Sequence, residues 1–170
     1  MALQGSFAEH AEILQTIGAD FSFVRCREDV QGLTHLIIPG GESSTLTKLL
    51  KDSGMWEEIL KQVQDDTLQI LGTCAGAILL EKLGMDLYCD RNGYGAQQES
   101  FLADLQSEKF PNLKGVFIRA PKFSRVGKKG INLATLQKEP VMVEQGNFLA
   151  LAFHPELVGE TRIHEYFLKK

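Results

Sequence analysis

Two short apolar runs, residues 33–38 and 68–71, each lead through a glycine-containing turn into a segment with helical periodicity. A strand buried on both faces is a continuous apolar run, and strands that alternate with helices are typical of a parallel sheet covered on both sides. The first half of the chain therefore predicts alternating strands and helices, with a further short β-prone run at residues 21–26. The expected helices are residues 8–17, 43–50, 56–63 and 75–83.

The second half of the chain changes character, because strand-like runs follow one another with few helical intervals. We expect antiparallel additions to the central sheet here, and a closing helix at about residues 160–168. The strand-like runs are residues 116–118, 133–136, 141–144 and 148–153. The whole pattern predicts a three-layer α/β/α fold with a mostly parallel central sheet, in a single domain over residues 1–170.

Composition restricts the class of partner and the cellular location. A net charge of −4 over 170 residues gives no reason to expect nucleic acid or an anionic membrane as a partner. No apolar run approaches the roughly 20 residues that a membrane span needs. Three cysteines cannot all pair within one chain, and no signal peptide is recognisable, so we expect a cytoplasmic protein with reduced thiols. No Cys/His grouping has zinc spacing, and we expect neither metal nor cofactor.

Cys74 lies within residues 72–76 (Gly-Thr-Cys-Ala-Gly), between an expected buried strand and an expected helix. This pattern has the form of a nucleophile elbow with cysteine in place of serine. Small flanking residues let the backbone approach closely on both sides, and a helix N-terminus favours a thiolate. The N–H of Ala75 would point to where a tetrahedral oxyanion forms. The alternative is a buried structural cysteine in a tight turn.

His154 and Glu156 follow the apolar run 148–153 and are separated by a proline. A residue before proline is pushed to extended geometry, and residues i and i+2 of an extended segment project to the same side. His154 could therefore act as a general base whose orientation Glu156 fixes. A lone histidine is more often structural, but a nucleophile elsewhere in the chain favours catalysis. We expect the other histidines to be structural or to face solvent; these are His10, His35 and His164.

Gly40 and Gly41 follow the buried run 33–38. Two adjacent glycines allow a peptide plane to turn its N–H toward a ligand, so Gly41 could supply a second oxyanion donor opposite Ala75. Residues 43–45 (Ser-Ser-Thr) begin a helix and could cap it. The alternative is an ordinary strand-turn-helix connection. Because ligands of such sheets lie beyond the carboxyl ends of the strands, we expect residues 39–41, Cys74 and the end of run 148–153 on one rim.

A glycine-framed cysteine, a distal His-Pro-Glu and an upstream Pro-Gly-Gly resemble the class I, triad-type glutamine amidotransferases. Within that class the chain resembles the family of glutaminase subunits of pyridoxal 5'-phosphate synthase, in blocks that follow the family order over nearly the whole chain. The blocks are residues 2–5 (Ala-Leu-Gln-Gly), 39–43 (Pro-Gly-Gly-Glu-Ser), 72–76 (Gly-Thr-Cys-Ala-Gly), 91–92 (Arg-Asn), 115–121 (Gly-Val-Phe-Ile-Arg-Ala-Pro) and 153–157 (Phe-His-Pro-Glu-Leu).

The resemblance implies a flavodoxin-like fold and the hydrolysis of L-glutamine to L-glutamate and ammonia. Cys74 would attack the side-chain amide to give a γ-glutamyl thioester, while His154 moves protons under the control of Glu156. An arginine would suit the α-carboxylate of glutamine. The ammonia would pass to a separate synthase subunit in a hetero-oligomer, and binding of that partner would complete the oxyanion hole. The residues implied to surround glutamine are Gly40, Gly41, Glu42, Arg91, Ile118 and Arg119.

Three departures from the family pattern accompany the resemblance. Met1 stands directly before Ala2, where the family has several apolar residues of a first central strand, so we expect a chain that is either truncated at its N-terminus or started internally, with a truncated first strand. The connection over residues 80–91 is shorter than in the family. The Gly-Arg-Gln that is usual in the family is replaced by Gly-Ala-Gln at residues 95–97. Three other interpretations stay open: a catalytically impaired regulatory subunit, a triad glutaminase serving another synthase, and a γ-glutamyl hydrolase.

Overall fold

A five-stranded sheet forms the centre of the computed structural model, which describes residues 1–91, 93–94 and 100–170. The strand order is β1-β2-β9-β8-β7. Strands β1 (His35–Ile38), β2 (Gln69–Thr73) and β9 (Phe148–Leu151) are parallel to one another. Strands β8 (Glu139–Gln145) and β7 (Ile131–Leu136) extend the sheet in antiparallel fashion. The predicted sheet, parallel with antiparallel additions from the second half, is confirmed.

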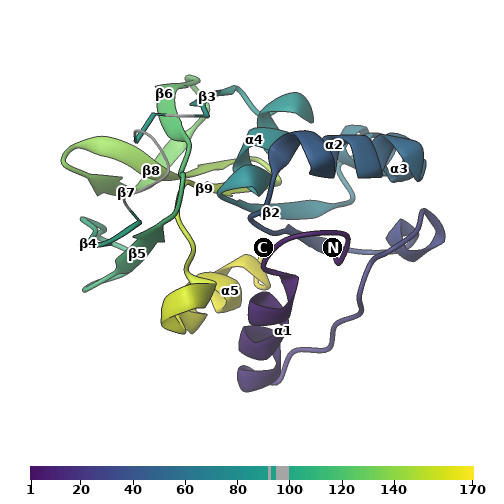
Figure 1. The fold of residues 1–170 in the computed structure, drawn as a ribbon, viewed down its shortest axis with the longest axis horizontal. Helices are drawn as coiled ribbons and strands as arrows, with labels where there is room; N and C mark the ends of the chain where they lie inside the picture. Colours follow the sequence, from purple (N-terminus) through teal and green to yellow (C-terminus); the bar gives the residue numbers. More distant parts are fainter. Residues whose placement is uncertain (92, 95–99) are drawn as a thin grey trace.

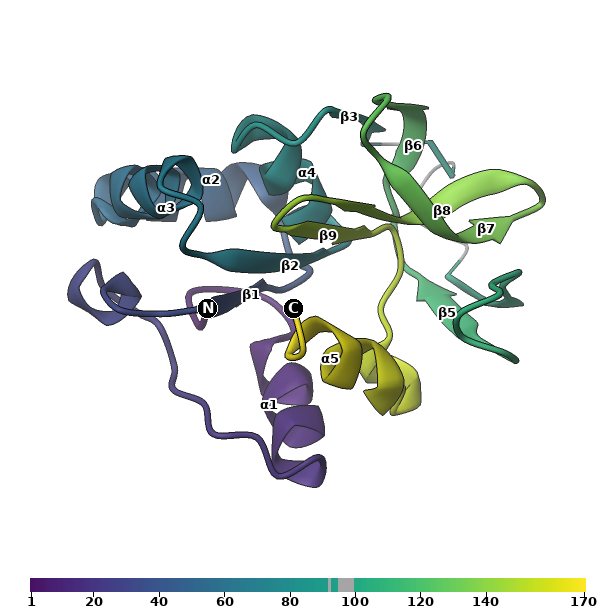
Figure 2. The same cartoon turned by 180° about the vertical axis from the view of Figure 1, so that it is seen from behind.

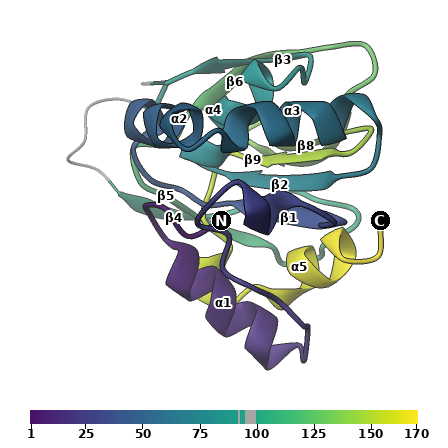
Figure 3. The same ribbon diagram turned by 90° about the vertical axis from the view of Figure 1, so that its right-hand side faces the viewer.

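Helices cover both faces of this sheet. Helices α2 (Ser43–Asp52), α3 (Met55–Gln64) and α4 (Ala75–Lys82) lie on one face (Figures 1 and 3). Helices α1 (Phe7–Thr16) and α5 (Thr161–Phe167) lie on the other. All five ranges agree with the predicted helices within two residues at either end, and the three-layer α/β/α fold is confirmed. Among the described residues, no helix has the length and apolar character needed to cross a membrane.

Two further antiparallel strand pairs stand outside the central sheet (Figure 2). Strand β3 (Leu87–Asp90) pairs with β6 (Lys122–Val126), and β4 (Phe101–Asp104) pairs with β5 (Lys114–Phe117). Only β5 overlaps a predicted strand. The other three were missed because they are short and are not buried on both faces; in β3, for example, buried and exposed positions alternate.

The predicted β-prone run 21–26 is not a strand, and this prediction was wrong. Val24 accepts a hydrogen bond from the backbone of Ala2 at 2.8 Å, but the run joins no ladder. Residues 20–24 and the edge strand β1 instead line a cavity of about 650 Å³, which Met1 also lines. A high β propensity does not form a strand unless a neighbouring strand supplies its hydrogen bonds.

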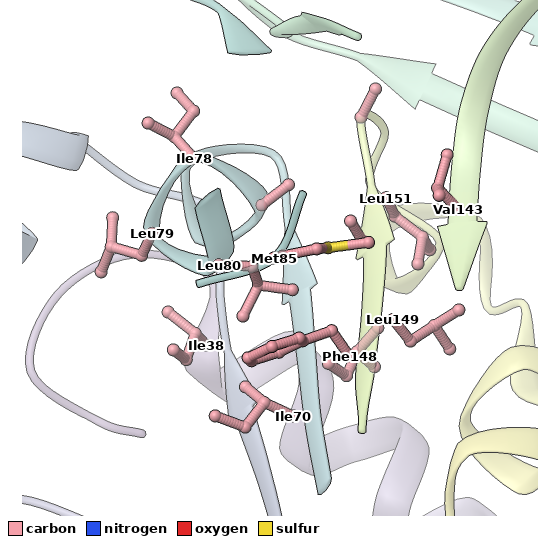
Figure 4. Packing of buried hydrophobic residues seen from close by; sticks show 14 of the residues in the cluster. Ile38, Ile70, Ile78, Leu79, Leu80, Met85, Val143, Phe148, Leu149 and Leu151 are labelled. Carbon is pink, nitrogen blue, oxygen red and sulfur yellow. The ribbon is translucent and has the colours of Figure 1, made fainter. Parts of the chain in front are cut away.

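The core includes the parallel strands and α4, whose first six residues (75–80) are all buried. Figure 4 shows Leu79 and Leu80 of α4 with strand residues such as Ile38 and Leu149. All ten residues from 71 to 80 are buried, so the turn between β2 and α4 has close-packed surroundings. This packing holds Cys74 between two rigid elements.

Candidate functional site

The carboxyl ends of β1, β2 and β9 meet at one edge of the sheet. The N–H of Gly40, just after β1, donates to Thr73 Oγ1 at the end of β2 at 3.0 Å. A Cβ built on Gly40 would lie only 2.3 Å from Cε1 of His154, so the imidazole lies directly against the Gly40 backbone. Cys74 N–H donates to the carbonyl of Leu151, the last residue of β9, at 2.8 Å. The predicted meeting of these three segments on one rim is confirmed.

Cys74 occupies a strained strand-to-helix turn. Its φ of 50° lies in the left-handed region that residues with a Cβ rarely adopt, and α4 begins at the next residue. A Cβ on Gly72 would lie 2.6 Å from the carbonyl carbon of Gly76, and one on Gly76 would lie 2.0 Å from the carbonyl oxygen of Ile38. Both flanking glycines are therefore required by close backbone approach, as a nucleophile elbow demands.

His154 and Glu156 form a buried pair beside this turn. His154 Nδ1 lies 2.7 Å from Glu156 Oε1. Burial raises the pKa of Glu156, but the hydrogen bond from His154 and nearby histidines lower it overall to about 2. Burial lowers the pKa of His154, but hydrogen bonds and charges of Cys74 and Glu156 raise it overall. With Nδ1 engaged by the carboxylate, Nε2 is the imidazole nitrogen left to serve Cys74.

The contact between His154 and Glu156 was predicted, but its backbone geometry was not. Pro155 has right-handed helical angles, φ −68° and ψ −28°, and Glu156 begins a short 3₁₀ helix, η2 (Glu156–Val158). The two residues therefore do not share one extended segment. His154 N–H donates to the carbonyl of Val116 at 2.8 Å, which fixes the last extended residue before the turn. A tight turn brings the carboxylate back to the ring.

Two backbone N–H groups at the rim have no acceptor among the described residues. In the part of the chain that the structure describes, neither Gly41 N–H nor Ala75 N–H makes a hydrogen bond. The carbonyl of Gly40 accepts from Ser6 N–H at 3.1 Å. Because the carbonyl and the N–H of one trans peptide point in opposite directions, Gly41 N–H points away from Ser6. Unpaired backbone donors at a rim are suited to an anionic ligand.

Glu42 caps helix α2. Its Oε1 accepts from Ser44 N–H at 3.0 Å and its Oε2 from Thr45 N–H at 2.6 Å. Hydrogen bonds from Thr45 and from the Ser44 and Thr45 backbone lower the pKa of this exposed carboxyl to about 2. The expectation that residues 43–45 supply the cap was wrong, because Ser43 is already the first helical residue. The carboxylate of Glu42 is engaged in the cap rather than free at the rim.

The other residues implied to bind glutamine are all exposed; these are Arg91, Ile118 and Arg119. The thiol of Cys74 donates to the carbonyl of Ile118 at 3.7 Å, so Ile118 is in direct contact with the candidate nucleophile. Arg91 is exposed, and its Nη1 donates to Ser44 Oγ at 3.4 Å, near the start of α2. Arg119 is exposed and has a φ of 48°. Asn92 and residues 95–97, which also carried predictions, lie outside the described residues.

Sequence reasoning missed the polar residues behind the His154–Glu156 pair. Ser6 Oγ donates to Glu156 Oε1 at 2.7 Å, and His10 Nε2 lies 3.5 Å from the same oxygen. His10 shares the buried side of α1 with Ala11, Ile13 and Leu14. Its place in that apolar stripe was the one available signal that a histidine would be buried. Across residues 1–91, 93–94 and 100–170, no group of three or more His, Cys, Asp or Glu residues could hold a metal ion.

The chain is similar to known proteins over its whole length. The model of the SNO glutamine amidotransferase family matches residues 1–170. Pyridoxal 5'-phosphate synthase subunit PdxT of a Thermus thermophilus strain is 45% identical, with 99% of this chain and 94% of the relative covered. The subunit of the same name from Francisella philomiragia is 43% identical, with 99% and 95% covered.

Solved structures agree as well. A protein described as a glutamine amidotransferase superposes with a TM-score of 0.94 at 44% identity, covering 99% of this chain and 95% of that one. PurLQS of Thermotoga maritima superposes with a TM-score of 0.73 at 16% identity, covering 98% and 93%, and shows a shared fold alone.

Proposed function

We propose, because this chain belongs to the SNO glutamine amidotransferase family, that it hydrolyses L-glutamine to L-glutamate and ammonia with Cys74 as nucleophile. One observation carries the proposal. A cysteine in a strained elbow lies beside an imidazole that a buried carboxylate holds at 2.7 Å. Nucleophile, base and orienting acid are then arranged as acyl transfer requires.

The reaction follows from the atoms at the rim. The Cys74 thiolate attacks the side-chain carbonyl carbon of glutamine, and the oxygen becomes an oxyanion that the free N–H groups of Gly41 and Ala75 stabilise. His154 donates a proton to the leaving nitrogen, so that ammonia departs and a γ-glutamyl thioester forms. His154 then takes a proton from water, which attacks the thioester and releases glutamate and the Cys74 thiolate. Glu156 keeps the imidazole oriented through both steps.

Binding of glutamine beside Cys74 is part of the proposal. The contact between the Cys74 thiol and the Ile118 carbonyl supports a binding site that includes residues 118–119. The closeness of Gly40 to the imidazole of His154 supports including the glycine turn. A guanidinium can hold the α-carboxylate of glutamine by two parallel hydrogen bonds, and Arg91 and Arg119 are the candidates. The proposed glutamine-binding residues are Gly40, Gly41, Glu42, Arg91, Ile118 and Arg119.

The proposal extends to a partner. The relatives are named as subunits of pyridoxal 5'-phosphate synthase, so we propose that the chain delivers ammonia to a synthase subunit in a cytosolic hetero-oligomer. The intact pair of His154 and Glu156 supports an enzyme over a catalytically impaired regulatory subunit. The 45% identity to a pyridoxal 5'-phosphate synthase subunit, over 99% of this chain, supports delivery of ammonia to this synthase rather than to another one. It also supports a glutaminase over a γ-glutamyl hydrolase.

The experiment that tests the proposal measures ammonia and glutamate released from glutamine, with and without the synthase subunit. The wild-type chain should release both in equal amounts, and Cys74→Ala should release neither. Cys26→Ser is the matched control, because Cys26 is an exposed thiol away from the rim. Release that persists in Cys74→Ala, or that is absent in the wild type under both conditions, would contradict the assignment.

A labelling experiment tests the nucleophile separately. An electrophilic glutamine analogue should modify Cys74 and spare the other two thiols. Cys89 is buried, and burial together with Glu81 raises the pKa of its thiol, so it should stay unmodified. Equal labelling of all three cysteines would show that the turn at Cys74 confers no particular reactivity.

A further inference from the structure

A buried polar network lies behind the rim, between the sheet and helices α1 and α5. Its centre is His10 of α1, whose Nε2 lies 3.2 Å from Thr73 Oγ1 and 3.5 Å from Glu156 Oε1. Its Nδ1 lies 2.8 Å from Nε2 of His164 in α5. All four side chains are buried, with exposed fractions of 3% for His10, 0% for Thr73, 6% for Glu156 and 0% for His164.

The two contacts of His10 Nε2 lead to different parts of the reaction centre. Thr73 Oγ1 also accepts the hydrogen bond from Gly40 N–H, so it holds the turn that precedes Gly41. Thr73 is also the residue directly before Cys74. Glu156 Oε1 is the oxygen that binds His154 Nδ1. One imidazole therefore contacts both the residue that holds the oxyanion turn and the carboxylate that orients the base.

Charge excludes an acid–base role for this imidazole. Burial lowers the pKa of His10 to about 3, against a smaller opposing effect of Glu156. Burial likewise lowers the pKa of His164. Both rings are neutral at neutral pH, so each offers one donor and one acceptor. The Glu156 carboxylate can only accept a hydrogen bond, so His10 binds it when the His10 proton is on Nε2, and Nδ1 of His10 then accepts from Nε2 of His164.

We infer that His10 is a positioning residue for the glutamine hydrolysis proposed above: it holds the Glu156 carboxylate and, through Thr73, the Gly40 turn in one fixed arrangement. The inference rests on the proposed function, because positioning has meaning only for a reaction at Cys74. Buried hydrogen-bond networks restrict their members to a single geometry when every contact is made. A misplacement of about 1 Å at a reacting group can lower a rate about a hundredfold.

The first test compares variants in the complex with the synthase subunit, by ammonia release from glutamine. His10→Leu should lower kcat roughly ten- to a hundredfold and leave KM within about threefold, because Arg91 and Arg119, the candidates for the α-carboxylate of glutamine, are exposed side chains outside the buried network. His10→Gln should restore part of kcat, since its amide can reach the position of Nε2. His35→Leu is the matched control: His35 is a half-buried histidine in β1 with a ring contact to Phe167, and its loss should leave kcat within about twofold.

A double-mutant cycle separates positioning from a general loss of stability. Thr73→Val removes the hydroxyl and keeps the side-chain shape, so it should lower kcat by itself. Combining it with His10→Leu should lower kcat little further, because both changes break one network. Fully multiplicative losses in the double variant would overturn the inference. Urea unfolding of each variant confirms that the comparison is made on folded protein.

A spectroscopic signal reports on the network without turnover. The proton between His154 Nδ1 and Glu156 should resonate far downfield in the proton NMR spectrum of the isolated chain, and His10→Leu should shift or broaden it while His35→Leu does not. A wild-type chain that releases no ammonia contradicts the proposed function, yet this signal would still report the contact of His10 with Glu156. An active wild type, with kcat and the resonance both unchanged in His10→Leu, overturns the positioning role alone.

Discussion

Helix α4 and strand β1 approach so closely that a Cβ on Gly76 would lie 2.0 Å from the carbonyl oxygen of Ile38. That oxygen belongs to the backbone, so it cannot move aside as a flexible side chain would. The closeness matters because Ile38 ends the strand that leads to Gly40, while Gly76 follows the nucleophile by two residues. The glycine therefore sets the spacing between the two halves of the rim.

Gly76→Ala should consequently reduce both stability and activity. The added methyl group forces α4 away from β1, an overpacking effect that typically lowers the free energy of unfolding by about 1–3 kcal/mol. Because Cys74 is displaced, the variant should release ammonia from glutamine more slowly. Urea unfolding and ammonia release measure the two effects. Gly18→Ala is the control, because nothing lies within 4 Å of the added group and only its φ of +69° is strained. If Gly76→Ala matches Gly18→Ala in both assays, the close approach is not limiting.

Removal of the charge on Glu156 should lower kcat without unfolding the chain. Glu156→Gln keeps the shape of the side chain but can hold His154 in the wrong tautomer, and the corresponding change in a serine protease lowers kcat about ten-thousandfold. We expect a loss of at least roughly a hundredfold in ammonia release, since the Cys74 thiolate is intrinsically a better nucleophile than serine. Glu160→Gln, a change in a carboxylate paired with Arg162, serves as the control and should keep wild-type kcat.

The same pair predicts a specific pH dependence of stability. The pKa of Glu156 is lowered in the fold, so its contribution is present above the ordinary value of 4.5 and is lost as pH falls. The pKa of His154 is raised, so its contribution is present below the ordinary value of 6.5 and is lost as pH rises. The difference in unfolding free energy between wild type and Glu156→Gln should therefore be largest between pH 4.5 and 6.5. A difference that does not change with pH would contradict the pairing.

Substitutions of Glu42 test whether this residue caps helix α2 or binds glutamine. Glu42→Ala should lower the melting temperature, because the N–H groups of Ser44 and Thr45 lose their acceptors. Since hydrogen bonds lower the pKa of Glu42 to about 2, the stabilisation should be present at neutral pH and be lost on acidification toward that value. Glu42→Asp, a shorter but still charged cap, should retain most of it. If KM for glutamine rises in Glu42→Ala at a temperature where the variant is fully folded, Glu42 has a second role in binding glutamine.

The open edge of β1 predicts that added strand structure will stabilise the fold. Met1 donates from its terminal ammonium to the carbonyl of Ile37 at 2.8 Å, and burial lowers the pKa of that ammonium to about 5. An extension of about five Val, Ile or Thr residues ahead of Met1 should lie along β1, fill the cavity and replace the buried ammonium by a peptide. Its melting temperature should rise. An extension of Gly and Ser of equal length is the control, and equal melting temperatures would contradict strand pairing.

Local signals in the sequence determined much of this protein. The apolar runs before residues 39 and 72 predicted parallel strands, the helical periodicities predicted all five helices, and the glycines around Cys74 predicted an elbow. These signals succeed because each depends only on residues close together in the sequence. A buried strand needs an apolar run, and a sharp turn needs residues with small side chains. His154 and Glu156 belong to the same class, being only two residues apart.

Only the tertiary structure determined which segments and residues far apart in the sequence are in contact. Residues 21–26 have the composition of a strand but join no ladder among the described residues, whereas β3, β4 and β6 form ladders because other segments pair with them. His10 was expected to be merely structural or exposed, yet it lies against Thr73, 63 residues away, and Glu156. Contacts between residues far apart depend on how all the layers pack together. No local sequence pattern predicts that packing, so the contacts of His10 with Thr73 and Glu156 could be identified only from the tertiary structure.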